Sequence, residues 1–239
     1  MAEPGFIRRP MAIALDAVRG AAPLAVTPAS SATDRLRRAL SLIAIPVLAL
    51  FALAGWLVAP APLEPTVSPR TVTTLARAPF ATRIVIGDSR AYGAPSRGGV
   101  LFAAYPGATI EDMARMAQAL CLLSDAQIVI ALGVNDAKAD MRRPAASLAA
   151  LERMVEGCGR ERVWVSEVWH GEPAKLPAGP DFDAATITTL NAGIRQLTAS
   201  GTGHLIAQPA LAGHTRDGIH FDQPTAARYE AMLAGVSAT

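Results

Sequence analysis

The chain has 239 residues, of which 51% are hydrophobic and only 18% charged, so it can bury a large core and global disorder is excluded. Its formal net charge is +2 at pH 7, and aromatic residues make up 5%. The sequence has no basic tract interleaved with aromatic residues, which argues against a nucleic-acid-binding protein.

The N-terminal part divides into a tail and an apolar run. Residues 1–38 lack a sustained apolar periodicity, which predicts a disordered tail. Residues 39–59 carry no charge, and a helix of that length at about 1.5 Å per residue spans the roughly 30 Å hydrocarbon core of a bilayer. The run is followed by prolines, which disfavour signal-peptide cleavage. We therefore expect an uncleaved transmembrane anchor rather than a signal peptide or a buried soluble helix.

Flanking charges predict how this anchor is oriented. Arg35, Arg37 and Arg38 precede the run, whereas the first basic residue after it is Arg70. The positive-inside rule then places the N-terminus in the cytoplasm and the C-terminal domain outside the inner membrane, in the periplasm of a Gram-negative cell. Residues 60–79 contain five prolines and predict a stiff, extended linker.

The C-terminal domain, 80–239, alternates short apolar runs with helical stretches. Continuous runs of branched residues fit strands that are buried on both faces. Strands that alternate with helices predict a parallel sheet covered by helices. The predicted strands are 83–86, 100–104, 126–132, 162–168 and 204–207, and the predicted helices are 110–123, 144–156, 182–200 and 224–233.

Short polar blocks follow the first three predicted strands, where open parallel sheets carry their functional groups. Ser89 lies in Gly-Asp-Ser-Arg after the first strand, and such a turn can present a hydroxyl at the sheet edge. Gly107 follows the second strand and can bring a backbone N–H close to a ligand. Asn135, in Gly-Val-Asn-Asp after the third strand, can donate an uncharged N–H to an oxyanion. Each block alone is also compatible with an ordinary turn.

A fourth block precedes the last predicted helix. Asp217 stands three residues before His220, so its carboxylate can bond one ring nitrogen and leave the other free as a base. By itself the block could be a surface loop.

In this order the four blocks resemble those of the SGNH (GDSL-like) hydrolases. The resemblance implies a three-layer α/β/α flavodoxin-like fold with a five-stranded parallel sheet. It implies a triad of Ser89 as nucleophile, His220 as base and Asp217 as its orienting carboxylate. It also implies an oxyanion hole made by the N–H groups of Ser89 and Gly107 and the side chain of Asn135. The sequence lacks the G-x-S-x-G elbow of the α/β-hydrolases.

Other residues leave alternatives open. Arg90 stands where the family's name-giving block has Leu, and it could favour an anionic or sugar substrate or be a solvated or ion-paired cation. Asp88 and Asp136 look structural. Cys121 and Cys158 could be buried thiols, or a disulfide in an oxidising compartment. No His has a companion at metal-ligand spacing, so we expect neither a metal nor a cofactor.

The expected function is that of a serine esterase that removes acyl groups, acetyl by preference, from a cell-envelope or exported carbohydrate. The alternatives are an O-acyltransferase that acts on exported polysaccharide and a non-catalytic accessory subunit of an export complex. The expected partners are the acylated substrate, the inner membrane through residues 39–59, and the polysaccharide synthesis or export machinery.

Overall fold

The structure is a computed structural model that describes residues 32–58, 69–138, 141–176, 182–209 and 214–235. The first helix, α1, runs from Ala32 to Val58, so residues 32–38 are helical rather than part of the expected tail. Across the described ranges, no helix is long and apolar enough to cross a membrane, and the expected transmembrane anchor is not confirmed. Residues 1–31 of the predicted tail lie outside the described residues.

The expected extended linker is wrong over its second half. Helix α2 spans Pro69–Arg77 and continues into the short helix η1, Ala78–Phe80. A proline is tolerated at the start of a helix, because the first N–H groups have no partner within the helix. Thr71, Thr74 and Leu75 form a buried stripe at helical spacing. Residues 69–80 are therefore helical and pack on the domain core, and residues 60–68 lie outside the described part.

The five predicted strands are confirmed as one parallel sheet in the order β2-β1-β3-β4-β5. In β1 to β4 almost every residue is buried, as expected for strands covered on both faces. The strands are β1 Arg83–Gly87, β2 Val100–Ala104, β3 Gln127–Ala131, β4 Val163–Ser166 and β5 His204–Ile206.

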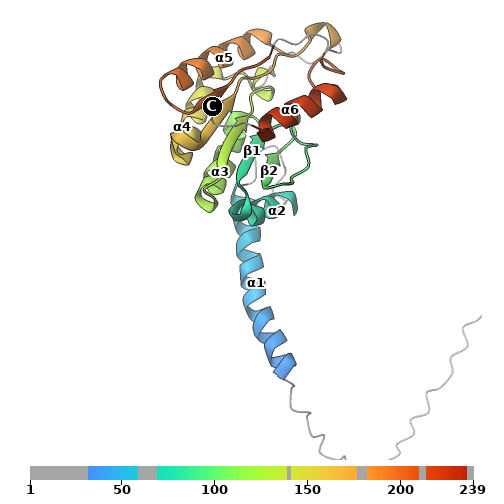
Figure 1. Cartoon of the computed structure of the whole chain (residues 1–239), viewed down its shortest axis with the longest axis vertical. Helices are drawn as coiled ribbons and strands as arrows, with labels where there is room; N and C mark the ends of the chain where they lie inside the picture. The colour runs from blue at the N-terminus through green and yellow to red at the C-terminus, as the bar shows by residue number, and fades with distance from the viewer. Residues whose placement is uncertain (1–31, 59–68, 139–140, 177–181, 210–213, 236–239) are drawn as a thin grey trace, which may run out of the picture. The chain divides into compact units, whose positions relative to one another are not determined.

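Helices cover both faces of this sheet, which gives the expected three-layer α/β/α architecture (Figure 1). Ile84 and Ile86 point to the face covered by α2, α3, α4 and α5, whereas Val85 points to the face covered by α6. Thr109 and Asp112 close a capping box at the start of α3, and Asp183 caps α5. The helices are α3 Ile110–Leu123, α4 Pro144–Cys158, α5 Ala184–Ala199 and α6 Gln223–Gly235.

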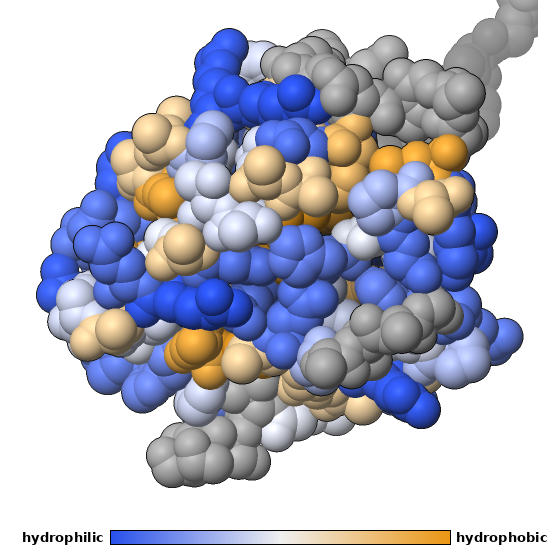
Figure 2. All heavy atoms as spheres, turned by 90° about the horizontal axis from the view of Figure 1, so that it is seen from above, coloured by the Kyte–Doolittle hydropathy of each residue, from blue (hydrophilic) through white to orange (hydrophobic). Residues whose placement is uncertain are grey.

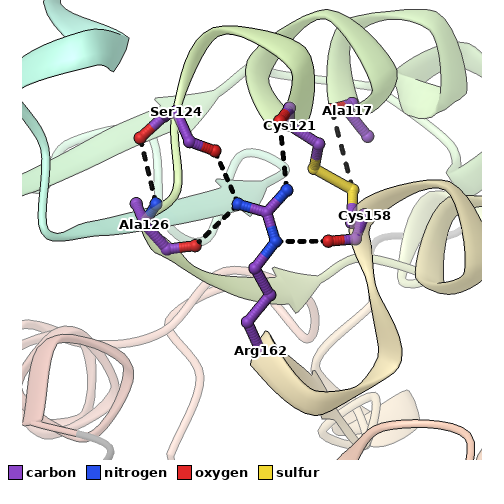
Figure 3. Close-up of a disulfide and its surroundings, with 6 residues drawn as sticks. All are labelled: Ala117, Cys121, Ser124, Ala126, Cys158 and Arg162. Carbon is purple, nitrogen blue, oxygen red and sulfur yellow. Dashed lines mark hydrogen bonds between the residues drawn. A yellow bond between two sulfur atoms is a disulfide. The ribbon is translucent and has the colours of Figure 1, made fainter.

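A disulfide and an arginine join α3 to α4 at the end of the sheet where the strands begin (Figure 3). Cys121 in α3 is bonded to Cys158, the last residue of α4. The Arg162 guanidinium donates to the carbonyls of both cysteines and to those of Ser124 and Ala126. A cation at two helix C-termini compensates the carbonyl groups that have no partner within the helix.

Candidate active site

The topological switch point of the sheet lies at the C-terminal ends of β1 and β3. The chain leaves β1 toward β2 on one side and leaves β3 toward β4 on the other, so the connections diverge between these strands. Ser89 lies two residues after the end of β1 and is half-buried. Asn135 follows β3 in a short helical turn, Asn135–Ala137. The sheet order thus brings two of the predicted site residues to one switch point.

Asp217 and His220 are in direct contact, as the spacing of the fourth block predicts. His220 Nδ1 lies 2.8 Å from Asp217 Oδ2, and the His220 backbone N–H donates to Asp217 Oδ1 at 2.7 Å. Partial burial by itself raises the pKa of Asp217. The bonds from the backbone and ring of His220 and from the Ile219 N–H outweigh that effect and lower the pKa to about 2. The carboxylate therefore stays ionised and fixes Nδ1, which leaves Nε2 of His220 as the basic nitrogen.

Arg90 connects the turn that contains Asp88, Ser89 and Arg90 (the serine turn) to the loop that contains Asp217 and His220 (the histidine loop). It is only 6% exposed, so it is not a solvated cation. Its Nε donates to the Ile219 carbonyl at 2.9 Å, and its Nη1 donates to the Trp169 carbonyl. The residue after Ser89 is therefore bonded to the residue before His220. The sequence shows a cation at position 90 but carries no signal for partners so distant along the chain.

Asp88 is the centre of the serine turn. It is buried, and its Oδ1 accepts the Arg90 backbone N–H at 2.9 Å. Burial raises its pKa, while Arg90, the positive form of His220 and a bond from the Val134 N–H oppose that shift. The loops after β1 and β3 and the loop before α6 thus converge on this carboxyl. Its structural role agrees with the expectation from sequence.

The three predicted oxyanion donors lie in the loops that follow β1, β2 and β3. Asn135 is buried, and its Nδ2 donates one hydrogen to the Ala108 carbonyl at 2.9 Å, which orients the amide and leaves its second N–H. Gly107 has a φ of 79°, a backbone conformation that residues other than glycine rarely adopt. Within the described residues, the backbone N–H groups of Ser89 and Gly107 donate to no protein acceptor.

Asp136 also has a structural role, as expected. Its carboxyl accepts from Ser147 Oγ at 2.6 Å and from the Ile110 N–H at 3.2 Å, so it joins the starts of α3 and α4. Burial raises the pKa of Asp136 to about 6 against these bonds. This carboxyl holds in place the loop that carries Asn135.

The loop after β4 holds the histidine loop from the other side. Glu172 accepts from the N–H and hydroxyl of Thr215 and from Lys175 Nζ, while that ammonium also donates to the Thr215 carbonyl. The bonds from Lys175 and Thr215 lower the pKa of Glu172 to about 2. His214 contacts the His170 carbonyl through Nε2 at 2.8 Å. No motif in the sequence indicates these contacts.

No family model and no curated protein matches the chain. Solved structures with a similar fold include a lipase/acylhydrolase from Enterococcus faecalis, with 21% identity, a TM-score of 0.53, and coverage of 66% of this chain and 98% of that one. A GDSL-like lipase from Bacteroides thetaiotaomicron has 19% identity and a TM-score of 0.55, over 70% and 94% of the two chains. The inhibitor-bound aryl esterase of M. smegmatis has 18% identity and a TM-score of 0.51, over 65% and 97%. The chain therefore has the fold of these GDSL-like lipases and esterases.

Proposed function

We propose that the chain is a serine ester hydrolase of the SGNH type, with Ser89, His220 and Asp217 as its triad. The observation that carries the proposal is the Asp217–His220 hydrogen bond, in a loop that Arg90 bonds to the turn of Ser89. The likeness to solved acylhydrolases and esterases supports the same reaction class.

The proposed reaction has two halves. The Ser89 hydroxyl oxygen attacks the ester carbonyl carbon while His220 Nε2 takes its proton. The N–H groups of Ser89, Gly107 and Asn135 stabilise the negative oxygen. The bond to the alcohol then breaks, and His220 returns the proton to that alcohol. Water repeats the sequence on the acyl-enzyme, which releases the carboxylic acid and restores Ser89.

A polar substrate is part of the proposal. A hollow of about 240 Å³ adjoins the loop of Asn135 and has a largely polar lining. The face of the molecule drawn in Figure 2 is mainly hydrophilic, with hydrophobic residues in small patches. Both features support an acylated carbohydrate with a small acyl group over a long lipid chain. The hollow is lined by Thr109, Glu111, Asp112, Asp136, Met141, Arg143 and Ser147.

The full-length chain tests this function directly. We expect Ser89-dependent hydrolysis of p-nitrophenyl acetate, with the rate falling as the acyl chain lengthens. Ser89→Ala is the matched control, since it removes only the hydroxyl oxygen. An acyltransferase would instead release p-nitrophenol faster when a sugar acceptor is added, and it would form acylated sugar. Equal rates in wild type and Ser89→Ala would contradict both enzymes and favour an accessory subunit.

We further propose that the domain works in an oxidising compartment outside the cytoplasm. The Cys121–Cys158 disulfide supports this location, because such bonds persist in oxidising surroundings and are rare in the cytosol. The anchor over residues 39–59, its orientation and an association with polysaccharide machinery stay predictions from the sequence. Thiol alkylation of the protein taken directly from cells tests the location. Blocked thiols agree with it, and freely alkylated Cys121 and Cys158 contradict it.

A further inference from the structure

We propose that Arg90 is a positioning residue that holds His220 in register with Ser89 by fixing the two chain neighbours of the histidine. The inference rests on the function proposed above and names a further residue on which its rate depends.

Arg90 contacts the chain on both sides of His220. On one side its Nε donates to the Ile219 carbonyl at 2.9 Å. On the other side its guanidinium carbon lies 4.5 Å from the ring centroid of Phe221, in a cation–π arrangement. One rigid planar group thus fixes both residues that flank His220.

The same side chain is rigidly connected to the nucleophile. Arg90 follows Ser89 in the chain, and its backbone N–H is bonded to Asp88 Oδ1 at 2.9 Å. Both chain neighbours of Ser89 therefore take part in one hydrogen-bonded turn. Nη1 extends the connection to the Trp169 carbonyl after β4. A displacement of the His220 loop relative to Ser89 would break bonds at Ile219 and Trp169 together.

A contribution to folding stability does not by itself explain why an arginine is buried at position 90. Burial of a guanidinium costs solvation energy, and an apolar side chain of similar length would fill the space without that cost. Within the part of the chain that the structure describes, Nη2 is buried and has no hydrogen-bond partner. An incompletely satisfied buried cation is unfavourable for folding. Its fork, however, reaches two carbonyls and one ring face at once, which a lysine ammonium cannot do.

The expected effect is on the rate and not on substrate affinity. A misplacement of about 1 Å between reacting groups can lower a rate by about 100-fold. We expect Arg90→Met to lower kcat by about 10- to 100-fold with KM changed less than about 2-fold. Arg90→Lys keeps the charge but offers a single donor nitrogen in place of the planar fork, so its kcat should fall between those of Arg90→Met and wild type.

Arg162 offers a matched control. Its guanidinium also donates to several backbone carbonyls, but at the end of the sheet where the strands begin, beside the disulfide (Figure 3). Arg162→Met should lower the melting temperature while kcat per folded molecule stays at the wild-type value. If Arg90→Met lowers kcat no further than Arg162→Met does, Arg90 only stabilises the fold and the inference is overturned.

A second readout separates this inference from the proposed function. The proton on His220 Nδ1, bonded to Asp217, should give a downfield NMR signal in the wild type. We expect this signal to broaden or vanish in Arg90→Met, to persist in Arg162→Met, and to be partly restored in Arg90→Lys. An unchanged signal in folded Arg90→Met would overturn the inference. If wild type gives the signal but hydrolyses no ester, the proposed function is wrong. The NMR comparison of Arg90→Met with wild type then still tests whether Arg90 positions His220. Should Arg90→Met not fold, Arg90→Lys and wild type give the same comparison.

Discussion

Cys121 and Cys158 form a disulfide between the last turns of α3 and α4, and Arg162 bonds to the backbone carbonyls of both cysteines. The two helix ends are therefore joined twice, once by a covalent bond and once by a guanidinium. Both connections lie where the strands of the sheet begin, at the opposite end from Ser89 and Asn135. This separation makes stability and activity independently testable.

Removal of the disulfide should lower stability and leave the chemistry intact. The cysteines are 37 residues apart, and closing a loop of that size restricts the unfolded chain by about 3–4 kcal/mol. Because Arg162 still joins the helix ends, the double variant Cys121→Ser/Cys158→Ser should fold, with an unfolding free energy lower by about 2–4 kcal/mol. Urea unfolding with and without reductant measures this. A lower kcat in the folded double variant would contradict the separation of the two ends.

Asn135→Ala should lower kcat by about 100- to 1,000-fold with little change in KM, because the amide is expected to bond the oxyanion mainly in the transition state. The variant also loses the bond to the Ala108 carbonyl, so its unfolding is measured beside its kinetics. A kcat within about 3-fold of wild type would remove Asn135 from the oxyanion hole.

Gly171→Ala should displace the histidine loop. A Cβ at this position would overlap the carbonyl oxygen of Gly218, which lies between Asp217 and His220, so one of the two loops must move. We expect kcat to fall by about 10-fold or more and stability by about 1–3 kcal/mol. Gly157→Ala in α4 is the control, since its Cβ meets only Gln118, at 3.9 Å. Equal kcat values for the two variants would show that the loop tolerates the shift.

Asp136 should make the fold less stable as the pH rises from about 4 to about 6. Its folded pKa of about 6 lies above the usual 3.8, so the protonated carboxyl favours folding. That contribution is fully present below pH 3.8 and is lost as the pH rises through 6, for a total on the order of 3 kcal/mol. Asp136→Asn should lack this dependence. Urea unfolding of both proteins between pH 4 and 8 gives the difference curve, and a flat curve would contradict the assignment.

The loss of folding stability at strongly acidic pH should come from Asp217 and Glu172. The pKa values of Asp217 and Glu172 are lowered to about 2, so the stability that these carboxylates contribute is present above their ordinary pKa values. That stability is lost as the pH falls toward 2. The contribution of Asp136 to stability has the opposite sign and changes at higher pH than those of Asp217 and Glu172. The difference in stability between wild type and Asp136→Asn therefore separates it from the contributions of the other two carboxylates.

Much of the fold could be predicted because its signals are local. The strands are continuous apolar runs, and Asp183 and the Thr109–Asp112 pair mark helix starts within a few residues. Helix α2 escaped prediction because its buried stripe contains two threonines, Thr71 and Thr74, in a segment dominated by prolines. A polar residue that packs through its methyl group gives a weak periodic signal.

The support of the site could not be predicted, because its partners are distant in sequence. The Arg90–Ile219 bond joins residues 129 positions apart, and the Glu172–Thr215 bond joins residues 43 apart. The Asp217–His220 contact, in contrast, spans three residues and follows from the spacing of one block. The sequence thus identifies the candidate chemical groups, whereas only the fold reveals the contacts that surround them.

Covalent capture of Ser89 tests the central claim most directly. The folded full-length chain is treated with a fluorophosphonate, which forms a phosphonyl ester with an activated serine and loses fluoride, and the product is mapped by peptide mass spectrometry. We predict one modified residue, Ser89, with labelling abolished in Ser89→Ala and slowed at least about 100-fold in His220→Ala. No labelling of the folded wild type, or equal labelling of Ser89 in His220→Ala, would contradict the proposal that these residues form a catalytic unit.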